Sequence, residues 1–274
     1  MTTLDIAAVG GATPRTRRGA TGDAWLAPAG ILASVALWWL ATDVVFAGRP
    51  LVSQFSPRLA VGGLVDLARS GVLLDAASAS LFRLVAGLLI AAVAGLAIGL
   101  ASGWSSRIDR ATRAVQLFLR MISPLSWAPV AIIAFGVGTP PVVALVAAAA
   151  VWPIASAAAD GVRGVHPGHL RVARSLGATT PEVIRRVVLP AIRPRVLAGV
   201  RLAIGIGWVV LVPAEMLGVT SGLGYQILNA KDQLAYPHIT ALIVVIGTIG
   251  FAIDVTARWL FATRRQRRDE GVRP

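Results

Sequence analysis

The sequence predicts an all-α, polytopic membrane protein with about six transmembrane helices. Hydrophobic residues occupy 56% of its 274 positions and charged residues only 14%, whereas roughly 25% of the residues of a soluble domain are charged. Apolar runs of roughly 20 residues, the length that crosses the hydrocarbon core of a bilayer, recur along the chain. Arginines gather in the segments between these runs.

Six apolar runs are expected to cross the membrane. The third contains Arg120, Pro124 and Pro129, so we expect it to pack inside the bundle, where neighbouring helices satisfy freed backbone groups. The first has no clear small-residue cleavage site and is interpreted as a retained signal anchor. The expected spans are residues 25–45, 80–101, 115–135, 141–159, 196–217 and 239–261.

Both ends of the chain are expected to be cytosolic tails. Residues 1–24 lack apolar periodicity, which predicts disorder, and residues 262–274 are basic. An even number of spans puts both termini on one side, and the positive-inside rule makes that side the cytosol. The arginines on that side are Arg15, Arg17, Arg18, Arg107, Arg110, Arg113, the seven from Arg163 to Arg195, Arg264, Arg265, Arg267, Arg268 and Arg273. The other side holds Arg49, Arg58, Arg69 and Lys231, so the net charge of +13 reflects this asymmetry and the anionic lipid of the inner surface.

A basic, proline-rich segment between the fourth and fifth runs predicts two short helices. Gly177 suits the left-handed residue that ends the first helix. Thr180 is the expected cap of the second helix, and Pro190 is expected to end it. Arg171 and Arg174 flank the apolar stripe of the first helix, so this helix offers an apolar ridge with charged edges, which suits a groove on a partner protein.

This segment resembles the cytosolic loop of the inner-membrane permeases of binding-protein-dependent ABC importers. That loop has the pattern Glu-Ala-Ala, three residues, Gly, nine residues, Ile, one residue, Leu-Pro, and the spacing from Gly to Leu-Pro is kept here. Arg171 replaces the acidic first residue and Val172 the first alanine. The resemblance implies a docking loop for an ABC ATPase, formed by Arg171, Val172, Ala173, Arg174, Gly177, Ala178, Val187, Leu189 and Pro190.

The resemblance extends from about Leu81 to Arg265, where the chain is similar to nitrate, sulfonate and taurine permeases. It is carried by the runs SPLSWAPVAIIAFGVG, GVRLAIGIGWVVLVPAEMLG and SGLGYQILNA. It implies a type I ABC importer-like transmembrane domain at residues 25–261, with a permease core at about 81–261 and the docking loop at about 161–195. It also implies a homodimer in a bacterial inner membrane, two ATPase subunits, a periplasmic or lipid-anchored solute-binding protein, and a small anionic solute such as a sulfonate, taurine or nitrate.

The residues that the chain lacks disfavour other functions. No Gly-Lys-Ser/Thr loop is present to hold ATP phosphates, there is no cysteine, and His166 and His169 are only a close pair, so we expect no metal site, no cofactor and no enzymatic activity. The arginines are scattered over loops, which disfavours nucleic-acid binding. An ion-coupled secondary transporter, which would show two related halves and more intramembrane carboxylates, and a non-transporting membrane scaffold are kept as alternatives.

The charges inside the apolar runs are the remaining candidates for function. A charged side chain that faces lipid at the bilayer centre costs about 2.5 to 3.5 kcal/mol. Glu215 is therefore expected to face the aqueous pathway as a gate, to pair internally with Arg83 or Arg120, or to reach the membrane interface as a snorkelling carboxylate. These alternatives stay open. Asp254 is expected to pair with Arg258 one turn away. The candidate pathway or gate residues are Glu215, Trp127, Trp208 and Pro129.

Overall fold

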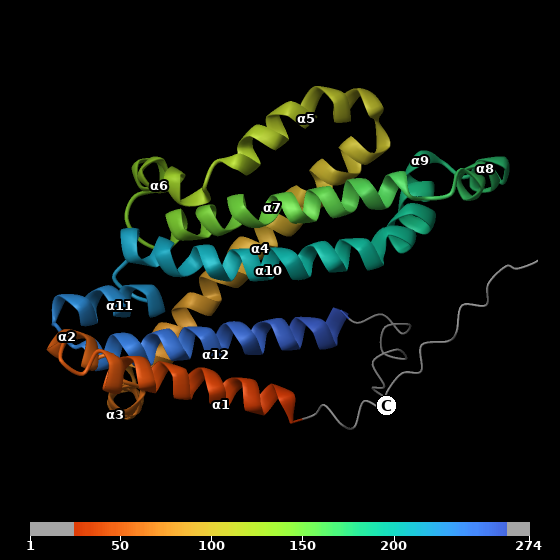
Figure 1. Cartoon of the computed structure of the whole chain (residues 1–274). Coiled ribbons are helices and arrows are strands. Elements are labelled where there is room, and N and C mark those ends of the chain that lie inside the picture. The colour runs from red at the N-terminus through yellow and green to blue at the C-terminus, as the bar shows by residue number, and fades with distance from the viewer. Residues whose placement is uncertain (1–24, 262–274) are drawn as a thin grey trace, which may run out of the picture. The chain divides into compact units, whose positions relative to one another are not determined.

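The computed structural model describes residues 25–261, and this part of the chain is helical with no strand. The all-α prediction is therefore confirmed. The tails predicted at residues 1–24 and 262–274 lie outside the described residues. The described part forms two units that divide after Pro57 (Figure 1).

The first unit holds one long apolar helix. Helix α1, Leu26–Trp39, continues into a π-helical turn, η1, Leu40–Val45, and a short helix α2, Pro50–Ser53, follows. The Trp38 indole N–H donates a hydrogen bond to the Phe55 carbonyl at 3.0 Å, which ties the end of the long helix to the segment after α2. Residues 28–45 are long and apolar enough to span a membrane, as predicted for the first span.

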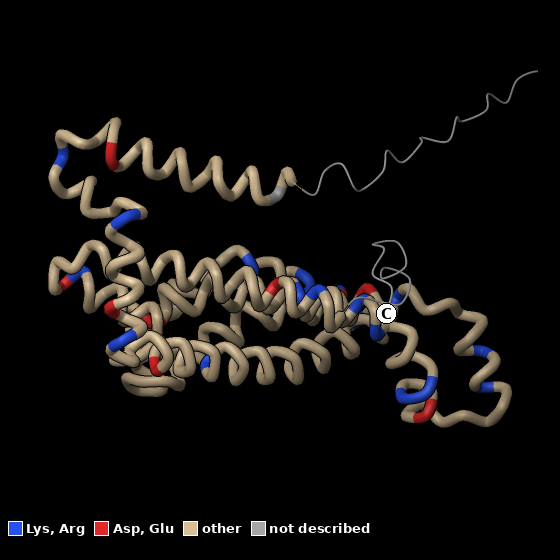
Figure 2. Tube along the Cα trace, turned by 90° about the horizontal axis from the view of Figure 1, so that it is seen from below, with Lys and Arg blue, Asp and Glu red and all other residues tan. Residues whose placement is uncertain are grey.

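The second unit contains the other helices, and Figure 2 shows that charged residues are sparse along the longest of them. Its elements are α3 Pro57–Arg69, α4 Val72–Trp104, α5 Ser106–Met121, η2 Pro124–Trp127, α6 Ala128–Phe135, α7 Thr139–Arg163, α8 Pro167–Ser175, α9 Thr180–Val183, η3 Ile184–Val188, α10 Leu189–Gly218, α11 Leu223–Asp232 and α12 Tyr236–Phe261. The predicted second, fourth, fifth and sixth spans fall within α4, α7, α10 and α12.

The predicted third span is not one helix. Helices α5 and α6 are bent by 90° from each other, so the described residues contain five spans, or six if this bent pair counts as one. The break has a local cause: Pro124 disfavours a helical conformation of the residue before it, and Ser123 is extended with ψ of 129°. No residue of α5 is buried, whereas α6 buries Ala128 and Ala131 in the core. The prediction that this span packs inside the bundle is therefore wrong for α5 but not for α6.

Helix α7 is the interior helix instead, with 61% of its most apolar stretch buried, against 17% for α12. It lies between α4 and α10 (Figure 1). Glycines on α4 allow the close approach: a β-carbon on Gly99 would lie 2.5 Å from the Ala155 carbonyl oxygen, and one on Gly95 would lie 2.7 Å from that of Val151. Small residues of this kind let membrane helices pack backbone to backbone.

Pro190 does not end a helix, contrary to the prediction. The chain is helical without a break from Thr180 to Gly218. The π-helical turn η3 lies directly before Pro190, which occupies the first turn of α10. A proline inside a continuous helix removes one backbone N–H donor. Here it follows the π-helical turn, where the regular hydrogen-bond pattern already changes. The second helix of the predicted docking loop therefore continues without a break into the fifth predicted span.

Candidate functional site

Helix α8 of the predicted docking loop has a cap at each end. The His166 imidazole accepts a hydrogen bond at 3.1 Å from the backbone N–H two residues on. At the other end Gly177 has a φ of +80°. Its N–H donates to the Arg174 carbonyl at 3.0 Å, and the Ala178 N–H donates to the Ala173 carbonyl at 3.1 Å. This pair of bonds is the Schellman ending, which needs a left-handed residue, so glycine suits this position as predicted.

Thr179, not Thr180, caps the second helix of the loop. The backbone N–H and the hydroxyl of Thr179 each lie 2.9 Å from Glu182 Oε2, which is the arrangement of a capping box. Thr180 is already the first helical residue. The predicted cap is thus wrong by one residue, and the helix begins one residue earlier than a cap at Thr180 implies.

The two faces of α8 have different surroundings. Leu170 and Ala173 turn inward against a small core whose buried residues are Val162, Val165, Val183, Val188 and Ile192. Val172 and Leu176 face outward and are 60% and 81% exposed. The spacing of Leu170, Ala173 and Leu176 predicts one exposed apolar ridge, and this is wrong for Leu170 and Ala173, which pack inward. The exposed apolar residues are Leu176 and Val172. The exposed set, which we call the docking surface, is Arg171, Val172, Arg174 and Leu176.

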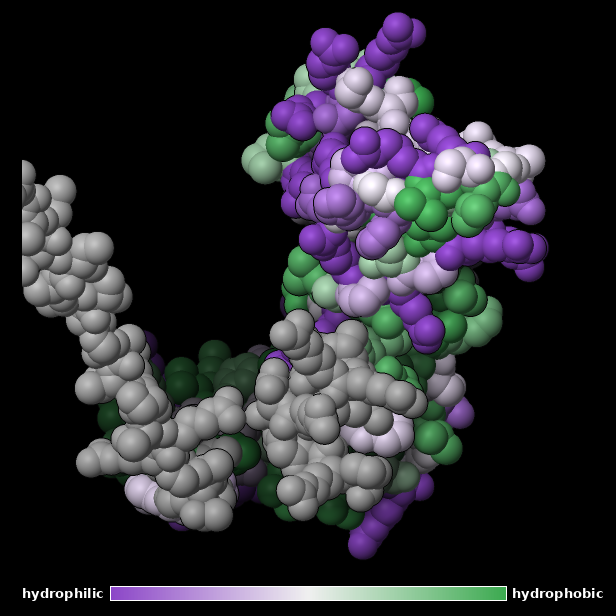
Figure 3. All heavy atoms as spheres, turned by 90° about the vertical axis from the view of Figure 1, so that its right-hand side faces the viewer, coloured by the Kyte–Doolittle hydropathy of each residue, from purple (hydrophilic) through white to green (hydrophobic). Residues whose placement is uncertain are grey.

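Figure 3 looks onto the end of the molecule that carries α8 and α9 and shows hydrophilic surface interrupted by apolar residues. The later residues of the family pattern are Val187, Leu189 and Pro190, and two of them pack beneath this end of the molecule. Val187 and Leu189 are half-buried, and Pro190 is exposed. Val187 and Leu189 therefore support the docking surface more than they extend it.

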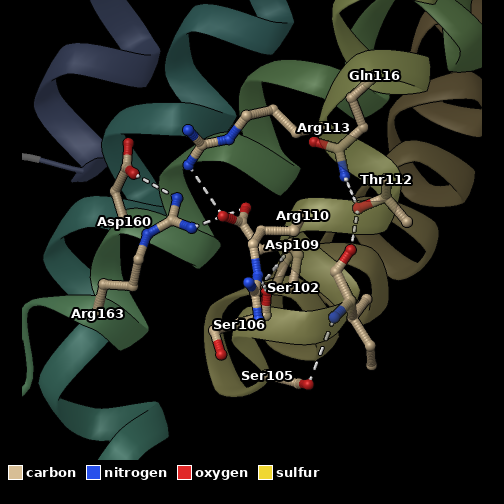
Figure 4. Close-up of polar contacts among 12 residues, drawn as sticks. Ser102, Ser105, Ser106, Asp109, Arg110, Thr112, Arg113, Gln116, Asp160 and Arg163 are labelled. Carbon is tan, nitrogen blue, oxygen red and sulfur yellow. Dashed lines mark hydrogen bonds and ion pairs between the residues drawn. The ribbon is translucent and has the colours of Figure 1, made fainter.

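A polar joint lies at the base of the loop, where α5, α7 and α10 meet. Asp109 accepts from Arg163 and from Arg113 at 2.9 Å each, and Arg163 also reaches Asp160 at 2.9 Å (Figure 4). Arg195 donates to the backbone carbonyls of Asp160 and the next residue at 3.4 Å each. Exposed pairs are worth at most about 1 kcal/mol each, so this joint sets the direction of the helix ends more than their stability.

A buried ion pair lies at the opposite end of α10. The Arg83 guanidinium and the Glu215 carboxylate meet at 2.7 Å, with side chains 4% and 0% exposed. Ser80 Oγ lies 2.9 Å from both Glu215 oxygens, and the Gly224 N–H donates to Oε2 at 2.9 Å. Arg83 also donates to the Ser221 carbonyl at 2.8 Å and to its hydroxyl at 2.6 Å. The pair thus fastens the turn between α10 and α11 to α4.

Of the two arginines predicted as internal partners of Glu215, Arg83 is the one that pairs with it in the structure. Arg120 instead lies 3.3 Å from the Ser156 hydroxyl. With no exposed surface, Glu215 has the surroundings of an internal pair in this structure. Its role as a gate stays a prediction.

The four candidate pathway residues do not form one site. Trp208 is 7% exposed and packs so closely on α12 that a β-carbon on Gly250 would meet its indole nitrogen at 2.5 Å. Trp127 is 42% exposed, and Pro129 is exposed beside it at the start of α6. A passage therefore cannot be lined by Trp208 or Glu215 in the conformation described.

A second charged group inside the spans was predicted only in part. Arg258 pairs with Asp254 at 2.7 Å, as expected. Arg201 on α10 joins them, 3.3 Å from Asp254, and sequence reasoning missed it. Its isolation between the uncharged stretches of a membrane span was a signal that could have found it. Residues 25–261 contain no group of three side chains suited to hold a metal ion.

Comparison with known proteins adds relatives and a fold. The family model described as binding-protein-dependent transport system inner membrane component matches residues 79–267. A bicarbonate transport system permease protein of Synechococcus elongatus is 35% identical over 184 residues, which cover 66% of each chain. A taurine transport system permease protein of Escherichia coli is 34% identical over 183 residues, 67% of this chain and 66% of the relative. The chain thus matches just under two thirds of the length of these relatives.

Solved structures share the fold at low identity. A chain of a bacterial ABC transporter that imports the acidic polysaccharide alginate has a TM-score of 0.59 at 17% identity, with 88% of this chain and 96% of that chain covered. A chain of an inward-facing methionine ABC transporter has a TM-score of 0.54 at 18% identity, with 66% and 92% covered.

Proposed function

Since residues 79–267 match its model, the chain belongs to the family of binding-protein-dependent transport system inner membrane components, and we propose that it is the permease subunit of an ATP-driven importer. In this proposal ATP is hydrolysed by a separate subunit and the chain itself is not an enzyme. Two ABC ATPase subunits, a second copy of the chain and a periplasmic or lipid-anchored binding protein complete the importer.

The observation that carries this proposal is the docking surface and the way in which α8 is connected to helices α7 and α10. The surface presents Val172 and Leu176 beside two exposed arginines on a helix capped at both ends. It leads directly into α7, the most buried helix, on one side and into the continuous rod of α10 on the other. A partner that displaced α8 would therefore move the core of the bundle as a rigid body, which is the motion that alternating access requires.

Two copies are needed for a passage in this proposal. The described residues of one copy bury Glu215 and Trp208, and no internal repeat supplies a second half. The surplus of arginines around α8 favours placing that end, and both chain termini, in the cytosol. A bacterial inner membrane is the compartment in which a binding protein outside and an ATPase inside can both reach the permease.

The solute is proposed to be a small anion. The relatives are named as permeases for bicarbonate, taurine, aliphatic sulfonates and nitrate. These solutes share a compact oxyanion group. The binding protein is expected to choose among them, so the permease needs only a passage that attracts anions weakly.

Co-purification in mild detergent tests the ATPase partnership. We expect the full-length chain to retain its ATPase at a 1:1 ratio of the two polypeptides, and Leu176→Asp to lose it, because Leu176 is 81% exposed on the docking surface. Leu74→Asp is the matched control, since Leu74 is 76% exposed at the opposite end of the unit. Absence of any ATPase from a preparation that still transports would favour an ion-coupled transporter, and a folded chain with neither activity would favour a scaffold.

A further inference from the structure

The triad of Arg201, Asp254 and Arg258 joins α10 to α12. Arg201 Nε donates to Asp254 Oδ1 at 3.3 Å, and Arg258 Nε donates to Oδ2 at 2.8 Å. Both oxygens of the one carboxylate are therefore occupied by arginines. The triad carries one carboxylate and two guanidinium groups, so its net charge is positive.

The triad lies within the apolar parts of both spans. Asp254 comes 18 residues after Tyr236, the first residue of α12, which corresponds to about 27 Å of helix. No residue from Ile239 to Ile253 is charged, and none lies between Arg201 and Glu215. That length of helix is most of the roughly 30 Å hydrocarbon core, so the triad lies near the end of both spans on the side of α8. An arginine at this depth reaches water through an aqueous passage or through the lipid head groups.

The interior of one copy does not enclose this triad. The side chains of Arg201 and Asp254 are each 40% exposed, whereas those of Arg83 and Glu215 are 4% and 0% exposed. Among residues 25–261, no group accepts a hydrogen bond from either terminal nitrogen of Arg201. The buried pair is complete within one copy, and Arg201 is not.

The face of α10 beside Arg201 is also uncovered. Leu202 and Val209 are 59% and 71% exposed, and a β-carbon on Gly205 would meet no atom within 4 Å. This apolar face has no polar group that would hold a solute tightly. Arg201 is the one cation at its edge among the described residues of α10 between Val196 and Gly218.

We propose that Arg201 lines the passage between two copies of the chain and binds the translocated anion through its free guanidinium edge. This inference rests on the proposed function, and it adds the group that makes the passage selective for anions. A planar guanidinium fork matches two oxygens of a carboxylate-like or sulfonate group. Asp254 acts as a positioning residue, because its bond to Nε holds the fork outward and partly offsets the positive charge, which keeps the anion from being trapped.

The absence of cysteine from the chain makes a direct test possible. Gly205→Cys places a thiol one turn from Arg201 in open space and leaves the triad unchanged. In the full-length chain in inside-out vesicles, we expect this thiol to react with small water-soluble methanethiosulfonates, and to react faster with the sulfonate-bearing reagent than with the quaternary ammonium reagent, after each rate is divided by that of free cysteine. An unreactive thiol, or a faster cationic reagent, would overturn the proposal.

Charge variants in the Gly205→Cys background then assign the preference to Arg201. Arg201→Gln should lower the ratio of anionic to cationic rates about three- to tenfold, because a charge about 6 to 12 Å away in water-like surroundings acts on the two reagents with opposite signs. Arg201→Lys should keep most of the ratio. The matched control is Arg258→Gln, which removes the same charge nearer the end of α12 and should change the ratio less; an equal or larger change would contradict the assignment.

Two further points distinguish this proposal from a lipid-binding role of Arg201 and from the proposed function itself. If a lipid head group occupied Arg201, adding phosphatidylglycerol to phosphatidylcholine vesicles would abolish the preference, and this result would also overturn the proposal. The labelling needs no solute and no ATPase. It can therefore fail while the co-purification succeeds, or succeed while the co-purification fails.

Discussion

The buried pair at the end of α10 opposite the docking surface gives the sharpest prediction of stability. In Glu215→Gln the amide nitrogen must replace one of two oxygens. Oε1 accepts from Arg83 and Oε2 accepts from the Gly224 N–H, so in either orientation a new donor faces an existing donor. The substitution also leaves the Arg83 charge buried with only neutral acceptors on Ser221 and Thr139.

Breaking a buried pair by removing one partner costs about 3 to 5 kcal/mol. A change of 1 kcal/mol shifts the melting temperature by about 2–4 °C in a chain of this size, so we expect Glu215→Gln to lower it by roughly 6–20 °C. Thermal unfolding of the detergent-purified chain, followed by size-exclusion chromatography or a thiol-independent dye, measures this shift. Asp232→Asn is the control, because its carboxylate is 65% exposed and 3.8 Å from Lys231, and it should shift the temperature by less than about 3 °C.

A melting temperature of Glu215→Gln within the range of that control would refute the reasoning. If the variant also folds and binds its ATPase but transports at a changed rate, Glu215 acts as a gate despite its burial. If it loses folded dimer, the pair is a structural fastening of the α10–α11 turn. The double change Arg83→Met with Glu215→Gln should recover part of the loss, because it leaves no unpaired charge.

Three other predictions follow from single positions. Gly177→Val should abolish ATPase-coupled uptake without preventing membrane insertion, whereas Gly177→Asn should retain uptake. A β-carbon at this position would meet no atom within 4 Å, so the destabilisation comes from the φ of +80°, which Asn tolerates and Val does not. Equal uptake by both variants would contradict this prediction. Thr220→Cys should react with an impermeant thiol reagent in intact cells and Thr180→Cys only after the membrane is opened, because both side chains are exposed and the two lie at opposite ends of α10 and the helix before it. Labelling of both from outside would contradict the orientation. Gly99→Ala should lower the melting temperature, because its β-carbon would lie 2.5 Å from Ala155 on α7. Gly247→Ala is the control, since a β-carbon there would meet no atom within 4 Å and should leave the melting temperature unchanged. Equal melting temperatures of the two variants would show that α4 and α7 can move apart with no loss of stability.

Much of the architecture was available from the sequence because hydrophobic length and arginine position depend on the membrane and not on tertiary detail. The five long apolar helices and the Gly177 ending are of this kind. The third span was misjudged for a physical reason. Its composition averaged an amphipathic helix, α5, with a short apolar one, α6, and the average resembles one span, whereas Pro124 turns the chain between them by 90°.

Ion pairs between residues far apart in the chain could not be predicted from the sequence. Arg83 and Glu215 are 132 residues apart, and the local pattern around Glu215 admitted two arginines as partners. The inward turn of Leu170 and Ala173 was likewise unpredictable, because a short helix with apolar residues on two faces does not reveal which face has a core behind it. The structure decides this by placing α7, η3 and the start of α10 on one side.

The two charged groups of the spans show why burial decides function better than pairing does. Each joins two helices through an arginine and a carboxylate, and a list of ion pairs would treat them alike. Arg83 and Glu215 have almost no exposed surface and are fully hydrogen-bonded by Ser80, Ser221 and Gly224, so they have no capacity left for a solute. Arg201 has one bond, an exposed side chain and surplus positive charge beside an uncovered apolar face. The surroundings that Arg201 lacks within one copy are therefore the place where the proposed passage for small anions can be tested.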